Sequence, residues 1–198
     1  MRSPQIQRRH MPVAATDAPH SLKVGRVMAR AWSEQIDDRR RQAAAWSFMA
    51  EAVAAYVETS GGPQGSPPHV SSVGVALTYK LDAAAAELAR TLGRSAAALP
   101  MELACFQLSA CYTAMLPQSV RSDWGAYYTP PVLTSRLLAM AEEAGVNWRT
   151  ARVLDPACGG GAFLLPVAIK MREQLPKLSA RKLLDHFATH LQGFEIDP

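Results

Sequence analysis

Apolar residues recur at helical spacing through the first half of the chain. Between Val27 and Val57 they fall three or four positions apart, with charged side chains between them. This spacing places the apolar residues on one face and predicts a long amphipathic helix. The acidic pair Asp37 and Asp38 falls inside the stretch, and we expect the helix to be interrupted there.

A second pair of helical patterns follows a segment rich in glycine and proline. That linker, residues 59–73, is too rich in these residues to form a continuous helix or a central strand. Residues 70–79 beyond it are a candidate for a short strand. Helices are expected over 81–91, with Gly93 as the C-cap, and over 100–116.

The segment before the next helix contains two prolines. Residues 119–124 are expected to form a loop. Thr129 is a plausible N-cap, with Pro130 and Pro131 in the first helical turn, where a missing N–H group has no consequence. This helix should continue to Gly145.

The last fifty residues alternate between short apolar runs and helical patterns. Residues 151–154 predict a buried strand, which ends at an acid and is followed by three glycines at 159–161. Pro166 indicates that the next helix is kinked or begins after the glycines. Ser179 is the expected N-cap of a further helix, and residues 194–196 are expected to begin a second strand.

This order of elements predicts an α/β fold: an incomplete Rossmann-like sheet preceded by a mainly helical N-terminal region. We divide the chain into a disordered basic tail at 1–24, a helical region at 25–118 and the start of an α/β domain at 119–198. Strand, glycine-rich turn and helix together are how such sheets form nucleotide sites. Glycine permits backbone turns that other residues avoid, and a close approach to a ligand.

Composition and charge exclude some classes of protein. The chain has 198 residues, of which 48% are hydrophobic, and no apolar run long enough to span a membrane or to act as a secretion signal. We therefore expect a globular, cytoplasmic protein. The net charge is +4, and residues 1–41 alone carry +5. This basic arm either contacts phosphates or is a solvated, charged surface, and the second is favoured because few aromatic residues lie among the arginines.

The cysteines and histidines give no metal signature. The three cysteines, Cys105, Cys111 and Cys158, have neither paired-thiol nor zinc spacing, and the first two are expected to be buried small side chains. His186 and His190 lie one helical turn apart without the acidic partner of a helical metal motif. An ordinary solvated or lightly buried pair is the expected outcome.

Two carboxylates are placed to hold a nucleoside. Asp155 follows the first strand, at the edge where open α/β sheets bind ligands. Glu195 lies forty positions later, near the end of the next expected strand. A carboxylate there accepts hydrogen bonds from a ribose diol in dinucleotide-binding folds, although the usual spacing is about 20 residues. The longer gap leaves room for two helices, or for one helix and a loop.

Three stretches together resemble the cofactor motifs of S-adenosylmethionine-dependent DNA adenine-N6 methyltransferases of the restriction–modification type. They are the stretches at 125–131, 153–164 and 193–198, and the resemblance covers roughly residues 116–198. It implies that Asp155 helps to hold the methionyl ammonium, that Glu195 holds the ribose and that Ile196 packs on the adenine. The full set of residues implied in binding the cofactor is Tyr127, Tyr128, Thr129, Pro130, Asp155, Ala157, Cys158, Gly159, Gly161, Glu195 and Ile196. Relatives often have serine or threonine where this chain has Gly160, a departure that we expect to be benign.

The resemblance also shows what the sequence lacks. In this family a loop of Asn, Asp or Ser, two prolines and an aromatic residue grips the flipped adenine. The nearest match, Ser66-Pro67-Pro68-His69, precedes the cofactor motifs and ends in histidine. We therefore expect the N-terminal portion of a larger or split methylase, inactive alone. Its expected partners are DNA, through the complete enzyme, and a complementing methylase or specificity chain.

Two alternatives remain open from the sequence. One is a non-catalytic helical interaction module with a vestigial nucleotide fold. The other is a methyltransferase that acts on protein or RNA, since only the resemblance of the tyrosine stretch favours DNA.

Overall fold

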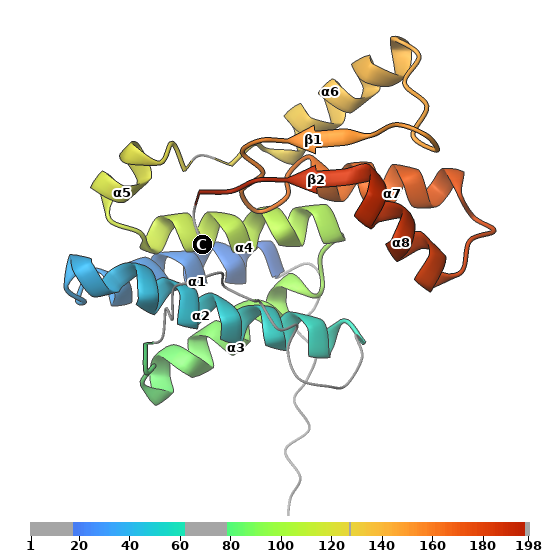
Figure 1. The fold of residues 1–198 in the computed structure, drawn as a ribbon. Coiled ribbons are helices and arrows are strands. Elements are labelled where there is room, and N and C mark those ends of the chain that lie inside the picture. The colour runs from blue at the N-terminus through green and yellow to red at the C-terminus, as the bar shows by residue number, and fades with distance from the viewer. Residues whose placement is uncertain (1–17, 62–78, 127, 197–198) are drawn as a thin grey trace, which may run out of the picture.

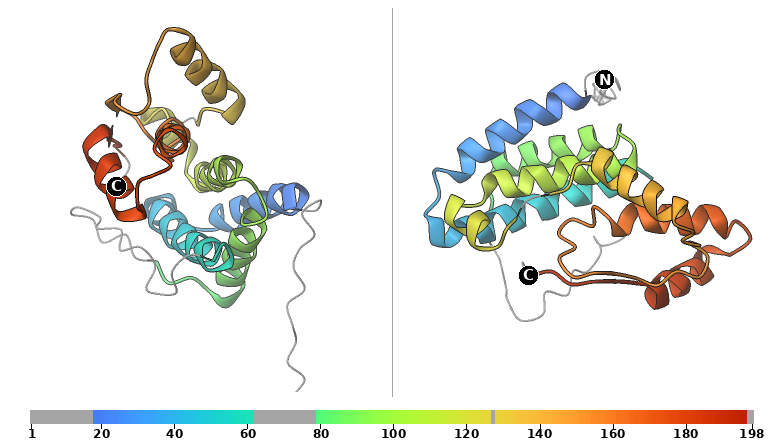
Figure 2. Two further views of the ribbon diagram at one scale, coloured as in Figure 1. Left: turned by 90° about the vertical axis from the view of Figure 1, so that its right-hand side faces the viewer. Right: turned by 90° about the horizontal axis from the view of Figure 1, so that it is seen from above.

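The computed structural model describes residues 18–61, 79–126 and 128–196 (Figure 1). The predicted strand at 70–79 and the near-match at 66–69 lie almost wholly outside these ranges. The elements are α1 (Ala18–Ser33), α2 (Asp38–Thr59), α3 (Ala83–Ala96), α4 (Met101–Met115), α5 (Gln118–Asp123), α6 (Pro131–Glu143), β1 (Val153–Asp155), α7 (Leu164–Gln174), α8 (Ala180–His190) and β2 (Leu191–Gly193). A helical part, α1–α4, lies beside an α/β part, with α4 between them (Figures 1 and 2).

The first four helices enclose their own apolar core. Its centre is Phe48, which is fully buried, and its remaining walls are mainly alanine and leucine side chains from all four helices. Small side chains allow the helix axes to approach closely. Helices α2 and α3 approach closely at Gly93, where an added Cβ would collide with the carbonyl oxygen of Ala52 on α2. Gly93 is therefore a packing residue inside α3, and its predicted role as the C-cap is wrong.

Aspartates fix the beginnings of two of these helices. The Asp37 side chain accepts a hydrogen bond from the Arg39 N–H group and caps α2, which confirms the interruption expected at this acidic pair. Asp82 accepts hydrogen bonds from the Ala85 N–H group (2.8 Å) and from the Trp32 indole (3.3 Å), so that it also ties α1 to α3. The bond from Ala85 is the main reason why the pKa of Asp82 lies below its ordinary value.

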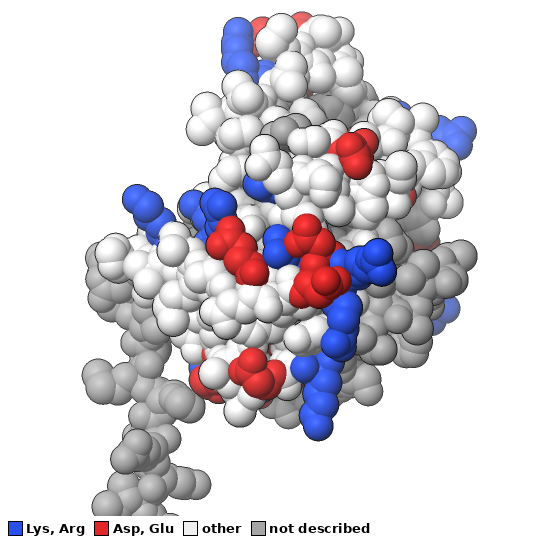
Figure 3. Space-filling model, turned by 90° about the vertical axis from the view of Figure 1, so that its left-hand side faces the viewer, with Lys and Arg blue, Asp and Glu red and all other residues white. Residues whose placement is uncertain are grey.

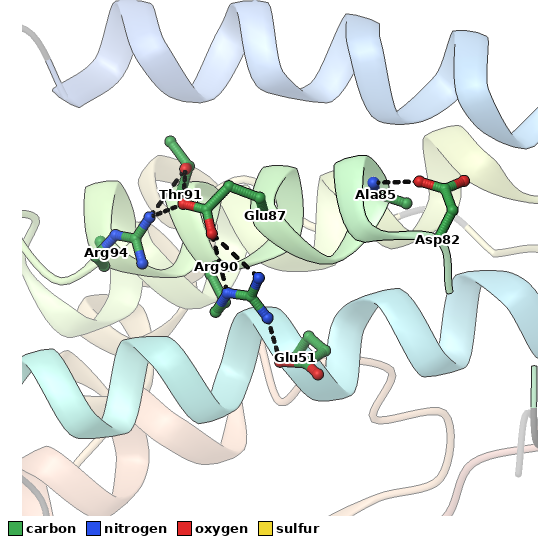
Figure 4. A network of polar contacts seen from close by, with 7 residues as sticks. All are labelled: Glu51, Asp82, Ala85, Glu87, Arg90, Thr91 and Arg94. Carbon is green, nitrogen blue, oxygen red and sulfur yellow. Dashed lines mark hydrogen bonds and ion pairs between the residues drawn. The ribbon is translucent and has the colours of Figure 1, made fainter. Parts of the chain in front are cut away.

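Charged side chains on the helical part largely pair with one another. Glu87 of α3 accepts from Arg94 at 2.6 Å and from Arg90 at 3.1 Å, and Arg90 also reaches Glu51 of α2 (Figure 4). The two arginines lower the pKa of Glu87. On the face drawn in Figure 3, Lys and Arg lie next to Asp and Glu. This face therefore presents no uninterrupted cationic surface of the kind that tracks a phosphate backbone.

The α/β part contains two parallel strands. Val153 pairs with Leu191 and Asp155 with Gly193, and both α7 and α8 lie between the strands in sequence. Of the two connections that the long spacing allowed, the one with two helices is the observed one. One side of the sheet packs on α6 and α7, around buried Trp148 and Met171. The described residues thus show a helical region followed by the beginning of a parallel α/β sheet.

An ion-pair cluster joins α6 to α7 beside this second core. Glu142 accepts a hydrogen bond from the Trp148 indole (2.7 Å) and pairs with Lys170 (2.6 Å). The Lys170 ammonium is the main cause, and the indole the second, of the lowered pKa of Glu142. These contacts hold α7, and with it the glycine-rich turn that precedes α7, at a fixed distance from α6.

Some predicted boundaries were wrong for local physical reasons. Residues 18–24 were assigned to the disordered tail, but they form the beginning of α1, whose buried Ala18 face is too weakly apolar to be recognised. The loop expected at 119–124 is mostly the short helix α5. The second strand comes three residues earlier than expected, because α8 runs directly into β2 at Leu191. The later start of α7, at Leu164, is confirmed.

The expected N-cap of α6 is also displaced. Pro130, rather than Thr129, is the N-cap, and it has an extended backbone with φ −62° and ψ 145°. A proline disfavours the helical conformation in the residue before it, so that Pro131 forces Pro130 out of the helix. Thr129 therefore lies outside the helix, directly before its N-cap. Among the described residues, no helix is long and apolar enough to cross a membrane.

Candidate cofactor site

The two predicted carboxylates lie at the same edge of the sheet. Asp155 ends β1, and Glu195 follows β2 by two residues. Because the strands are parallel and in register, both carboxylates emerge at the carboxyl edge. Cys158 lies close to both. Its pKa is raised first by burial and then by the negative charges of Asp155 and Glu195. The structure therefore brings together the two acids that the sequence separates by forty positions.

The glycine-rich turn connects these acids. Gly159 and Gly161 have φ values of +49° and +78°, in the left-handed region that favours glycine. The turn is held to the second strand by a hydrogen bond from the Cys158 N–H group to the Phe194 carbonyl oxygen (2.8 Å). In return, the Phe194 N–H group donates to the carbonyl oxygen of Asp155 (2.9 Å). The turn and the end of β2 are thus one unit.

Glu195 is oriented by the backbone of this unit. Its Oε2 accepts a hydrogen bond of 2.6 Å from the Gly159 N–H group, and its Oε1 accepts one of 2.9 Å from the Ile196 N–H group. Asp155 is held similarly, since its Oδ1 accepts from the Ala157 N–H group at 3.2 Å. Backbone N–H groups thus orient both carboxylates at this edge of the sheet.

Tyr128 covers the glycine turn from the other side. A Cβ added at Gly159 would lie 2.6 Å from the Cε1 atom of the Tyr128 ring, so only glycine fits beneath it. Tyr127 lies outside the described residues. Pro130 is exposed, and Ile196 is 71% exposed beside Glu195. An exposed isoleucine at this position is available to contact a flat ring.

A cavity of about 230 Å³ opens on the same turn. Its walls come from three places: the first half of α4, the Tyr128–Pro131 segment with α6, and the turn with the start of α7. The residues that line it are Pro100, Glu102, Leu103, Cys105, Phe106, Ser109, Tyr128, Thr129, Pro131, Ser135, Gly160, Gly161, Ala162, Leu165 and Pro166. Asp155, Glu195 and Ile196 are not among them. The predicted residues thus form two groups that meet at the glycine turn.

The contribution of α4 was missed from the sequence. Ser109 on α4 fills the space in which a Cβ of Gly160 would stand. Gly160 is therefore needed for packing against α4, a role that the expectation of a benign departure at this position did not include. No pattern in the sequence marks Ser109 or Glu102, because each is a single polar residue in an otherwise apolar helix.

The remaining candidates make no site. His186 and His190 stack with ring centroids 3.8 Å apart, and the pKa of His186 is lowered by burial and then by His190. Burial raises the pKa of Cys111 to about 12, as expected for a buried thiol. Within the described ranges, no group of three or more His, Cys, Asp or Glu side chains is placed to hold a metal ion.

The strands, the glycine turn and the two acids define a class of site. Parallel strands, a glycine turn at their carboxyl edge and two acids around it are typical of ligand sites in open α/β sheets. A family model described as N-6 DNA methylase matches residues 110–197. The match covers less than half of the chain, and it confirms the resemblance seen in the motifs. No curated protein and no solved structure matches the chain.

Proposed function

We propose that the chain is the cofactor-binding part of a DNA adenine-N6 methyltransferase and binds S-adenosylmethionine. The observation that supports this most strongly is that Asp155 and Glu195 lie at the same ends of two paired parallel strands, with Glu195 hydrogen-bonded to the Gly159 N–H group of the glycine turn. The family match supports DNA methylation, and the cofactor, the adenine specificity and the behaviour of the chain alone are our inferences.

The residues fit the chemical groups of this cofactor. Glu195, exposed and already oriented by two backbone N–H groups, would accept the hydroxyls of the ribose. Ile196 would contact the adenine, and Asp155 offers negative charge to the cationic end. Thr129 and Tyr128 border the cavity on the other side of the turn. Thr129 and the backbone around Tyr128 and Pro130 would hold the methionyl carboxylate. The bound cofactor supplies an electrophilic methyl group on a sulfonium ion.

The acceptors for the target base are not assigned to this chain. To methylate an adenine, the base must leave the helix and its amino group must meet hydrogen-bond acceptors next to the methyl group. No Asn, Asp or Ser followed by two prolines and an aromatic residue is present in the sequence. We propose that groups outside these 198 residues supply the acceptors and the DNA contacts, and that the 198 residues alone transfer no methyl group to DNA.

Titration calorimetry with S-adenosylmethionine tests the proposal. We expect micromolar binding by the wild-type chain. Glu195→Ala should weaken it by about 10- to 150-fold, because hydrogen bonds to a charged group contribute roughly 1.5–3 kcal/mol. Asp155→Ala should weaken it as well. Glu173→Ala, on the exposed end of α7, is the matched control and should leave affinity unchanged.

Two results would contradict the proposal. A folded wild-type chain that binds no S-adenosylmethionine would favour the alternative of an interaction module. Incorporation of labelled methyl groups into DNA by the pure chain would show that the catalytic groups are present after all. Labelling of protein or RNA instead of DNA would change the substrate class.

A further inference from the structure

The cavity beside the glycine turn has a distinct polar lining. Its walls are mainly apolar, but five of the lining residues carry side-chain oxygen atoms: Glu102, Ser109, Tyr128, Thr129 and Ser135. Glu102 and Ser109 come from the part of α4 that precedes the family match at residue 110. The family resemblance therefore does not account for them.

Glu102 has no counter-ion in the described parts of the chain. It is half-buried, and within those ranges its carboxylate makes no hydrogen bond or ion pair. Its charge is felt by Cys105, whose pKa is raised by burial and then by Glu102. An acid in the first turn stabilises a helix through the macrodipole, which explains why Glu102 is tolerated on α4. It does not explain why the carboxylate lines an apolar cavity, where a charge needs a partner.

The cavity has room for part of the cofactor. A volume of about 230 Å³ is enough for a group of several heavy atoms. The aminoacyl arm of S-adenosylmethionine beyond its sulfur is such a group, while the complete molecule is several times larger. We place the nucleoside on the other side of the turn, where Glu195 stands.

We propose that α4 completes the cofactor site, with Glu102 pairing with the α-ammonium group of the aminoacyl arm and Ser109 donating to its carboxylate. This inference rests on the proposed function and extends the site to residues outside the family match. The zwitterionic arm would place its positive end at Glu102, in place of the Asp155 that the family resemblance implies, and its negative end among the hydroxyls of Ser109 and Thr129. Asp155 would then offer its negative charge to the sulfonium ion. Glu102 would thus be a specificity-determining residue for an amino acid arm.

Ligands that lack parts of the arm test this assignment by calorimetry. Glu102→Gln should weaken the binding of S-adenosylmethionine at least tenfold and leave the affinity for 5′-methylthioadenosine, which has no aminoacyl arm, unchanged. The same substitution should also weaken the binding of decarboxylated S-adenosylmethionine, which keeps the ammonium group. Ser109→Ala should weaken the binding of S-adenosylmethionine, but not the binding of its decarboxylated form. Glu173→Gln on α7 is the matched control, and circular dichroism checks that each variant is folded.

The outcomes separate the two levels of inference. Equal effects of Glu102→Gln on S-adenosylmethionine and on 5′-methylthioadenosine would overturn the role of Glu102 while the proposed function stands. If Glu102→Gln leaves the affinity for both ligands unchanged, the role of Glu102 is likewise overturned and the proposed function stands. If the folded wild-type chain binds none of these ligands, the proposed function fails, and the role of Glu102 fails with it.

Discussion

Substituting Gly159 tests how the glycine turn, Tyr128 and Glu195 depend on one another. Alanine at this position meets two penalties. The φ of +49° is in the left-handed region, where a Cβ costs roughly 1–2 kcal/mol. The new Cβ would also lie 2.6 Å from the Tyr128 ring, and overpacking of this kind costs about 1–3 kcal/mol.

Gly161 provides the matched comparison. Its φ of +78° imposes the same kind of strain, but nothing lies within 4 Å of the position that a Cβ would occupy. Alanine restricts the unfolded chain and so regains about 0.4–1 kcal/mol at both sites. We expect Gly161→Ala to destabilise by about 1 kcal/mol and Gly159→Ala by about 2–4 kcal/mol.

Urea unfolding followed by circular dichroism measures both free energies. A double-mutant cycle with Tyr128→Ala isolates the collision: in that background, the effect of Gly159→Ala should fall to that of Gly161→Ala. Gly159→Ala should also lower the affinity for S-adenosylmethionine at least tenfold, because the displaced N–H group no longer orients Glu195. Equal destabilisation by the two alanines in the wild-type background would refute this reasoning.

Three further predictions concern other parts of the chain. Gly93→Ala gains roughly 1 kcal/mol of helix propensity, but the new Cβ collides with the Ala52 carbonyl group. We expect a net loss of stability in urea unfolding. A stabilised variant would show that α3 is not packed this closely. Because the pKa of Asp82 is lowered in the fold, its contribution to stability is present above its unfolded pKa and is lost as pH falls through the folded pKa. Asp82→Ala should therefore flatten the decline of Tm in acid. Parallel curves of Tm against pH for the variant and the wild type would contradict this. The pKa of the Cys158 thiol is raised by burial and then by Asp155 and Glu195. Its alkylation, followed by mass spectrometry, should therefore be slower than that of an unshifted thiol and should accelerate in Glu195→Gln. An unchanged rate would show that the Glu195 charge does not reach the thiol.

Local patterns predicted the elements that depend on neighbours in sequence. The strand ending at Asp155, the helix capped by Ser179 and the break at Asp37 were all found where expected, within a few residues. The common edge of Asp155 and Glu195 was also predictable, since parallel strands with intervening helices leave their carboxyl ends together. Short stretches of sequence were therefore enough to predict the part of the site at the edge of the sheet.

Features that depend on distant contacts were not predictable. Gly93 resembles a helix end in sequence, and only the approach of α2 shows that it is a packing residue. Likewise, the wall that α4 contributes to the cavity follows from the docking of the helical part on the glycine turn, with Ser109 against Gly160. A single serine and a single glutamate in an apolar helix give no signal of such a contact.

The most direct test of the account is a map of the cofactor site by amide NMR. S-Adenosylmethionine is titrated into the ¹⁵N-labelled chain, and the chemical shifts of the backbone N–H groups are followed. Our account predicts that Gly159, Gly160 and Ile196 shift together with one midpoint, and that this midpoint rises by about 10- to 150-fold in Glu195→Ala. Binding whose shifts lie away from the glycine turn, or an unchanged midpoint in Glu195→Ala, would contradict it.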